Sequence, residues 1–145
     1  MRVLVQRCKY ARVSVDKKIV GEIDNGIMAL VGFTDGDDIN KINYMVDKLI
    51  NLRIYDDENG VMNKSLMDTN GSILSVSQFT LYADTSKGRR PSYVNAMKGE
   101  ESSKLYDLFN SKLIEAGINI GTGIFGADME VELLNDGPVT VMLEK

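Results

Sequence analysis

Two short stretches of the sequence combine residue types that could take part in chemistry. The first, residues 77–81, reads Ser-Gln-Phe-Thr-Leu and ends a β-prone run over residues 72–81 that is apolar enough to be interior. Buried hydroxyl and amide groups are costly unless each finds a hydrogen-bond partner, in the sheet or in a bound molecule. Ser77, Gln78 and Thr80 are therefore candidates for catalysis or substrate positioning, with bonding inside the sheet as the structural alternative.

The second stretch, residues 135–140, reads Asn-Asp-Gly-Pro-Val-Thr and lies between two apolar runs near the end of the chain. Pro138 has no N–H for a strand ladder, and Gly137 tolerates backbone angles closed to other residues. One interpretation is a tight turn that joins two strands. The other is a rigid polar tip, because a cis Gly-Pro bond would direct two neighbouring carbonyl groups the same way. Residue types alone leave both open.

Several kinds of site are excluded by composition. The chain has no histidine and a single cysteine, Cys8, so it holds no Ser-His-Asp triad, no histidine-ligated metal and no disulfide within the chain. Residues 56–60 contain three adjacent carboxylates, but they lack the alternating oxygen ligands of a calcium loop. We therefore expect no metal and no cofactor, and any catalysis has to use hydroxyls, carboxylates, amides, lysine, the backbone or the substrate itself.

Charge and hydropathy limit the partners. A net charge of −4 argues against non-specific coating of nucleic acid. A local patch remains, because Lys87, Arg89 and Arg90 surround Gly88; they are candidate RNA contacts or else a solvated loop. No apolar run is long enough to span a bilayer, and the first residues do not resemble a signal peptide. We therefore expect a cytoplasmic protein with no membrane contact.

The remaining patterns predict an α+β fold. Alternating apolar residues predict strands at Arg2 to Cys8, Ala11 to Asp16, Lys18 to Ile23, Ile27 to Phe33 and Asp128 to Leu134, with an Asn-Gly hairpin at residues 24–26. Helical spacing predicts helices ending near residues 51–52 and over residues 100–116. A second hairpin is expected around residues 56–60. We expect one β-rich domain over residues 1–145, with an antiparallel or mixed, barrel-like sheet and two main covering helices.

The segment 119–127 is rich in glycine but is not a typical phosphate-binding loop. No lysine follows Gly126, and the next residues alternate like a strand instead of beginning a helix. We interpret it as a loop in which the backbone approaches another group closely.

With these motifs in hand, the whole chain strongly resembles the D-aminoacyl-tRNA deacylases, chirality-proofreading enzymes of translation. The resemblance rests on residues 77–81 and 135–140 and is supported by Val5-Gln6-Arg7 and by residues 51–55, 87–92 and 122–129. One departure is Ile124, which stands where many members carry arginine, so a polar contact from that position is not expected here.

The resemblance implies hydrolysis of the ester bond of D-aminoacyl-tRNA by a homodimer. Gly137 and Pro138 of one subunit would enter the partner's site as a Gly-cis-Pro tip and leave no room for an L side chain. Glycine has no side chain to exclude, so we expect glycyl-tRNA to be cleaved as well. Catalysis would use the 2′-hydroxyl of the terminal ribose with backbone amides near Phe79 and Thr80, while Gln78 positions the substrate. The alternative is that Thr80 is the nucleophile, although no base for its hydroxyl can be identified in the sequence. The remaining candidates are Ser77, which with Thr80 would shape the pocket, and Arg7, Phe125 and Met129, which would line or support it.

Two other classes of function fit parts of the sequence. One is a non-catalytic module that binds RNA ends through residues 87–90 and stacks bases on Phe125 or Tyr93. The other is a structural dimer module in which Gly137 and Pro138 form an ordinary turn.

Overall fold

One long strand, β1 (Arg2–Val15), organises the sheet in the computed structural model, which describes all 145 residues. Residues 2–8 of β1 pair with β3 (Gly26–Gly32), and residues 11–15 pair with β2 (Lys18–Ile23) along the same edge. The other edge of β1 pairs with β8 (Glu130–Glu144). The expectation of two strands before residue 16 is therefore wrong, because the chain stays extended through residues 9 and 10 between the two paired segments of β1.

The expected hairpin at residues 24–26 is also wrong. Strands β2 and β3 both pair with β1 and not with each other, so the Asn-Gly pair only bends the chain from one part of the β1 edge to the next. The sheet continues through β6 (Ser72–Ser77) and β7 (Ile120–Thr122), which run parallel to their neighbours. The mixed sheet that the sequence predicts is thereby confirmed.

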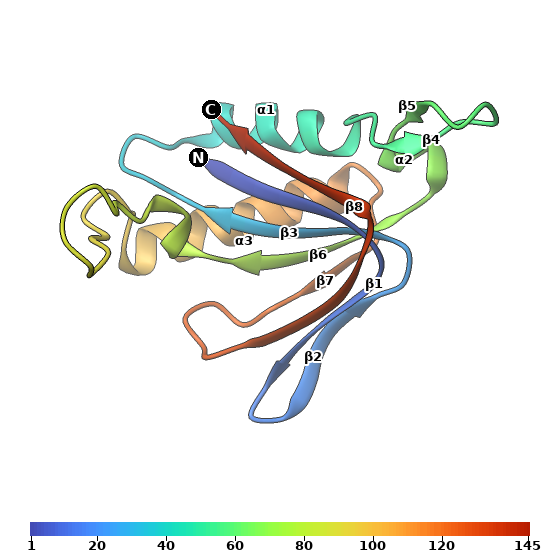
Figure 1. Cartoon of the computed structure of the whole chain (residues 1–145). Coiled ribbons are helices and arrows are strands. Elements are labelled where there is room, and N and C mark those ends of the chain that lie inside the picture. Colours follow the sequence, from blue (N-terminus) through green and yellow to red (C-terminus); the bar gives the residue numbers. More distant parts are fainter.

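Two long helices supply the connections between the parallel strands. Along the chain, helix α1 (Ile39–Ile50) follows β3 and precedes β6, and helix α3 (Gly99–Glu115) follows β6 and precedes β7 (Figure 1). Both pack on the larger hydrophobic cluster, which contains the buried face of α1 that the apolar spacing predicts (Ile42, Met45, Val46, Leu49, Ile50). The remaining elements are short: β4 (Tyr55–Asp56), β5 (Met62–Lys64), α2 (Leu66–Thr69) and the 3₁₀ helix η1 (Phe79–Tyr82).

Local sequence signals account for the helix ends. The Asp38 carboxylate caps α1 by accepting hydrogen bonds from the backbone N–H groups of Lys41 (3.0 Å) and Asn40 (3.1 Å), and these bonds lower the pKa of Asp38. Helix α3 ends at Glu115, and Gly117 follows with a φ of +85° that favours glycine. Both main helices are thus confirmed close to their predicted bounds.

The sheet curls until its first and last strands nearly meet (Figure 1). A Cβ atom built on Gly21 of β2 would lie 2.4 Å from the Thr122 carbonyl oxygen of β7, so the two strands approach too closely for a side chain. A second, smaller cluster of seven buried residues, including Cys8 and Leu74, fills the space inside this curl. The fold is the α+β, barrel-like architecture that the sequence predicts, and no helix is long and apolar enough to cross a membrane.

Three further boundaries differ from the expectations. The strand predicted over residues 72–81 ends at Ser77 and is followed by η1; part of the predicted loop over residues 119–127 forms β7. The last strand runs from Glu130 to Glu144, through the Gly137-Pro138 dipeptide. The turn interpretation of that dipeptide is therefore wrong, since β8 pairs with β1 on both sides of it, at Asn135 and at Thr140.

We predict that the thiol of Cys8 is inert in the folded protein. The side chain is fully buried, and burial raises its pKa to about 11. At pH 8 about one molecule in a thousand would carry the thiolate, the form that reacts. Ellman's reagent should therefore label the native protein negligibly within an hour and the unfolded protein with one equivalent. Fast labelling of the native protein would contradict this packing.

Candidate active site

The end of β6 brings the Ser-Gln-Phe-Thr motif to one mouth of the curled sheet. Gln78 N–H donates to the Val31 carbonyl oxygen (2.7 Å), and Leu81 N–H donates to the Gln78 carbonyl oxygen (3.4 Å). The amide groups of Phe79 and Thr80 lie between these two bonds, at the start of η1, and the turn leaves both without an acceptor. Two backbone donors are therefore free beside Ser77 and Gln78.

Gly32 allows this sharp turn. A Cβ atom at residue 32 would lie 2.8 Å from the Gln78 carbonyl oxygen and 3.3 Å from Leu81 Cβ, closer than packed atoms normally approach. The chain can therefore cross directly over the end of β3 only because residue 32 has no side chain.

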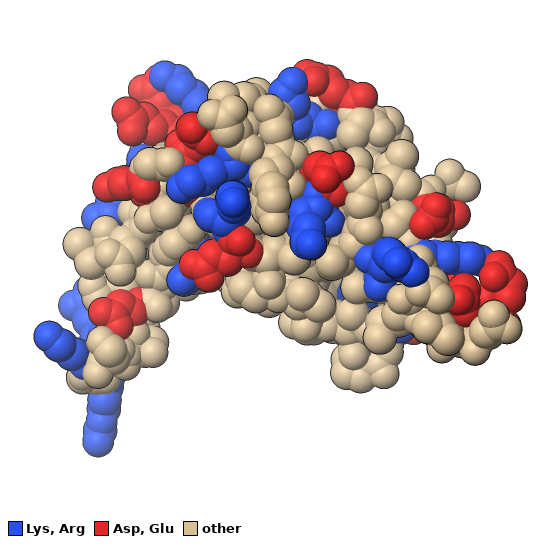
Figure 2. Space-filling model, turned by 90° about the horizontal axis from the view of Figure 1, so that it is seen from above, with Lys and Arg blue, Asp and Glu red and all other residues tan.

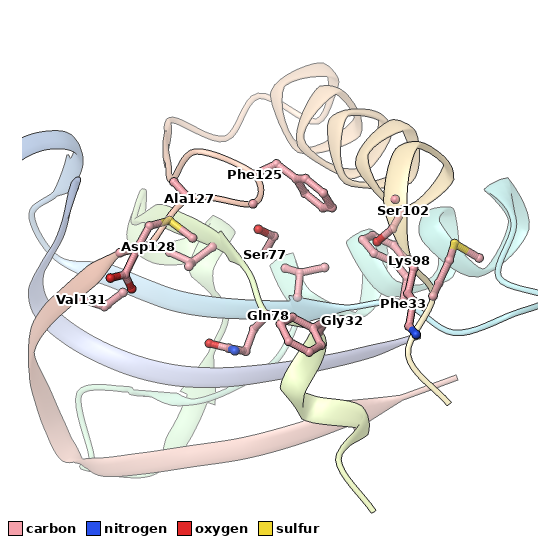
Figure 3. A pocket seen from close by; sticks show the side chains of 17 residues that line it. Gly32, Phe33, Ser77, Gln78, Lys98, Ser102, Phe125, Ala127, Asp128 and Val131 are labelled. Carbon is pink, nitrogen blue, oxygen red and sulfur yellow. The ribbon is translucent and has the colours of Figure 1, made fainter. Parts of the chain in front are cut away.

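The motif forms one wall of a cleft of about 520 Å³. Ser77, Gln78 and Phe79 line it on one side, and residues 125–129 and 131 form the facing wall. Figure 3 shows Ser77 in the middle of the cleft, below Phe125, with Asp128 at one end and Ser102 at the other. The lining is mainly apolar with a few polar groups, which is typical of a small-molecule or terminal-nucleotide site.

The aromatic wall is held in place by buried polar contacts. Tyr106 Oη donates to the Ser75 carbonyl oxygen (2.8 Å), and its ring lies 6.0 Å from the ring of Phe125, centroid to centroid. Gly123 N–H donates to the same carbonyl oxygen (3.0 Å), and a Cβ atom at residue 123 would lie 2.6 Å from Met129 Sδ. The glycine-rich segment is thus a close-approach loop, as the sequence suggests, and it positions Phe125 and Met129.

Thr80 is close to the cleft but does not line it. Its Oγ1 accepts a hydrogen bond of 2.6 Å from Gln78 Nε2, so the hydroxyl orients the Gln78 side chain. Ser77 makes no side-chain hydrogen bond and points into the cleft (Figure 3). Ser75 is fully buried, and its hydroxyl has no hydrogen-bond partner.

The second motif lies outside this cleft. The Gly137-Pro138 peptide bond is cis, both residues are exposed, and the segment bulges from β8 opposite Arg7. Asn135 Oδ1 accepts from Val139 N–H (2.9 Å) and closes the bulge. A single copy of the chain therefore does not bring residues 137 and 138 to the cleft formed by residues 77–79.

Arg7 supports the bulge and not the cleft. Its side chain is 8% exposed; Nε donates to the Asp136 carbonyl oxygen (3.0 Å), and Nη1 donates to the Ile54 carbonyl oxygen (2.5 Å). The Asp136 carboxylate also lies 3.4 Å from Arg7 Nε and 3.1 Å from Lys9 Nζ. Charge-assisted bonds to one buried guanidinium thus fix the backbone just before Gly137.

The basic loop lies at one end of the molecule. Lys87, Arg89 and Arg90 are exposed and make no ion pair. Figure 2 shows basic side chains projecting from the end of the molecule where this loop lies in Figure 1, whereas acidic and basic residues are mixed over the rest of that face.

Comparison with known proteins identifies the family. The family model described as D-Tyr-tRNA(Tyr) deacylase matches residues 4–144. The chain belongs to this family. It is 54% identical over 144 residues to the D-aminoacyl-tRNA deacylase of Listeria monocytogenes serotype 4a, covering 99% of this chain and 95% of the relative, and equally identical to that of Brevibacillus brevis, covering 99% of each.

A solved structure has the same fold as this member of the deacylase family. The c-Myc DNA Unwinding Element Binding Protein is 39% identical, aligns over 100% of this chain and 99% of its own, and superposes with a TM-score of 0.94. The resemblance that the two motifs indicate is thereby confirmed.

Several lining residues of this deacylase-family cleft escape sequence reasoning. Lys98, Ser102 and Asp128 line it. Lys98 and Ser102 belong to the polar run 98–104, which has the composition of a solvated helix start, and Asp128 stands alone between apolar residues. A polar residue on the buried face of α3, as at Ser102, is the one signal that could have indicated a site. Ile124, the departure from the family pattern, is 48% exposed and does not line the cleft.

Proposed function

We propose that the protein hydrolyses the ester bond of D-aminoacyl-tRNA to tRNA and a free D-amino acid, a chirality-proofreading step. Family membership over residues 4–144 carries this proposal. The cleft adds support, because it is large enough for a terminal nucleoside and the two free amides at residues 79 and 80 lie beside it, across from an apolar wall.

The chemistry needs little from side chains. An aminoacyl ester is already activated, so hydrolysis requires an oriented water molecule and donors for the developing oxyanion. The amides of Phe79 and Thr80 would be these donors. Water adds to the carbonyl carbon, the bond to the ribose oxygen breaks, and that oxygen leaves with a proton. We assign the proton transfer to the adjacent 2′-hydroxyl of the substrate, because the chain has no histidine to act as a base.

Rejection of L substrates is assigned to a second copy of the chain. Gly137 and Pro138 are exposed and lie outside the cleft of their own subunit. Strand β8, which carries them, pairs with β1 alone, and exposed apolar side chains lie along it (Val131, Leu134, Met142). An unpaired strand edge with apolar neighbours favours association. In a homodimer the tip would enter the partner's cleft and exclude an L side chain from the substrate α-carbon.

The tRNA body would contact the basic loop. Lys87, Arg89 and Arg90 have no acidic partners and lie in the loop after η1, which ends the catalytic motif. They would neutralise phosphates without reading bases, while the terminal adenine stacks on Phe125.

Steady-state turnover tests the enzyme against a module that only binds RNA ends. With D-tyrosyl-tRNA in hundredfold excess over protein, we expect each protein molecule to release many molecules of D-tyrosine. Tight binding of charged tRNA with no release of D-tyrosine would refute the enzyme and favour the binding module.

We predict that Thr80→Ala retains most of the deacylase activity. The Thr80 hydroxyl is occupied by Gln78 Nε2 and has no base beside it, so the substitution removes one orienting hydrogen bond and lowers kcat/KM by less than about tenfold. Thr80→Ser, which keeps the hydroxyl, is the matched control. Complete loss in a folded Thr80→Ala protein, with activity kept in Thr80→Ser, would instead identify Thr80 as the nucleophile.

We also predict cleavage of glycyl-tRNA. Glycine has no side chain, so a filter that works by exclusion has nothing to exclude. Glycyl-tRNA should be hydrolysed at least about tenfold faster than L-alanyl-tRNA, which differs by one methyl group. Equal resistance of the two substrates would count against steric exclusion as the filter.

A further inference from the structure

The end of the cleft opposite Asp128 is formed by the start of α3, through Lys98, Gly99 and Ser102. Lys98 is the N-cap residue and has no side-chain hydrogen bond that caps the helix. The first N–H groups of the 17-residue helix therefore lack acceptors, and the helix dipole adds partial positive charge at this point. Met97 N–H donates to the Phe33 carbonyl oxygen (2.9 Å) and fixes the helix start against the end of β3.

Ser102 gives an independent indication that this end of the cleft takes a polar ligand. The residue is 5% exposed, and its hydroxyl makes no hydrogen bond within the protein. Figure 3 shows Ser102 projecting from α3 into the cleft. The Ser102 hydroxyl is not among the fully buried unpartnered atoms, so it is open to the cleft and available to donate a hydrogen bond to a molecule bound there.

The charges around this point favour an anion. Lys98 lines the cleft and makes no ion pair, and Figure 3 places it on the same side as Ser102. The first turn of α3 carries two exposed glutamates, neither of which lines the cleft: Glu100 is bound to Lys104 at 2.7 Å, and Glu101 makes no ion pair. Asp128 is the one acidic lining residue, and it lies at the opposite end.

We infer that Lys98, the Ser102 hydroxyl and the free amides at the start of α3 form an anion subsite for the 5′-phosphate of the substrate's terminal adenosine. This inference rests on the proposed function, which puts the ester carbon of the substrate at residues 79–80 and its adenine at Phe125. With the substrate in that position, the 5′-phosphate is the anion of the RNA chain nearest to Lys98 and Ser102. Lys98 and Ser102 then contribute binding that is the same in the ground and transition states, and they act on KM and not on kcat.

The test compares two minimal substrates, 3′-O-(D-tyrosyl)adenosine with and without a 5′-phosphate. The phosphate should raise kcat/KM of the unaltered protein about tenfold, mainly through KM, as expected for charge-assisted hydrogen bonds. Lys98→Ala should remove most of this gain, and Ser102→Ala should reduce it about threefold. Lys112→Ala, in the last turn of α3 and outside the cleft, is the matched control and should keep the full gain.

Equal kcat/KM values for the two esters, or a gain that survives Lys98→Ala, would overturn the subsite while leaving the deacylase intact. The opposite case is a protein that has the anion subsite but no deacylase activity. Calorimetry of the binding of adenosine 5′-monophosphate and of adenosine identifies it. If neither ester is cleaved, yet the monophosphate binds about tenfold more tightly than adenosine and Lys98→Ala abolishes the difference, the subsite stands and the proposed activity fails.

Discussion

Gly137→Ala is expected to lower the preference for D-tyrosyl-tRNA over L-tyrosyl-tRNA by about 10- to 100-fold, because displacing a positioning group by roughly 1 Å can cost that much. Gly137 has a φ of +126°, and an added Cβ atom would lie 2.9 Å from Val139 Cγ2 and 3.0 Å from Arg7 Nη2. The bulge has to shift, and its carbonyl groups shift with it. Initial rates of release of the two tyrosine enantiomers from charged tRNA measure the effect.

Gly60→Ala provides the matched control for this substitution. Gly60 also has a positive φ, +74°, but it lies in an exposed loop where an added Cβ atom meets nothing within 4 Å. Gly60→Ala should lower the free energy of unfolding by about 1–2 kcal/mol, the cost of a left-handed conformation for alanine. Gly137→Ala should lower it by at least as much, because its added Cβ atom also meets Val139 and Arg7. Only Gly137→Ala should change the ratio of D to L rates. An unchanged ratio of D to L rates in a folded Gly137→Ala protein would contradict the proposal that Gly137 and Pro138 exclude L substrates.

Removing the 2′-hydroxyl of the terminal adenosine is expected to lower the rate of deacylation by about 100- to 10,000-fold, the range for loss of a positioned proton-transfer group. The protein offers no histidine. The Thr80 hydroxyl is bound to Gln78, and the Ser77 hydroxyl, which points into the cleft, makes no hydrogen bond to a group that could act as its base. Single-turnover hydrolysis of D-tyrosyl-tRNA that ends in 2′-deoxyadenosine measures the loss.

The deoxy substrate should still bind. It would make the same contacts with the cleft and the basic loop as the normal substrate. When it is used as an inhibitor of D-tyrosyl-tRNA hydrolysis, its KI should therefore lie within about threefold of the KM for the normal substrate. A difference of about threefold corresponds to the loss of one hydrogen bond at most. If the deoxy substrate were cleaved at the normal rate, the protein would have to supply the base, and the assignment of chemistry to the substrate would be wrong.

The helices were predictable from sequence and the strand pairings were not. Helix α1 follows from local information, namely the spacing of its apolar residues and the capping carboxylate of Asp38. The pairing of β2 and β3 with one edge of β1 depends on the length of β1, which both of its neighbours stabilise. The Asn-Gly signal at residues 25 and 26 marks a bend in the chain but contains no information about which strand pairs with which.

The same distinction applies to the candidate site. The sequence contains both motifs, and the structure brings Ser77, Gln78 and Phe79 together with Phe125 and Met129 in one cleft. Thr80 and Arg7 act one step away from it, on Gln78 and on the bulge before Gly137. Lys98 and Ser102 could not be predicted as lining residues, because only the packing of α3 against the end of β3 brings them there.

The most direct test of the account is the hydrolysis of D-tyrosyl-tRNA and L-tyrosyl-tRNA by the pure protein in one assay. We expect the D ester to be cleaved at least about 100-fold faster than the L ester, because in the proposed homodimer only the L side chain would meet the Gly137-Pro138 tip of the partner. Equal rates for the two esters, or release of neither amino acid, would contradict the proposal that this protein removes D-amino acids from tRNA.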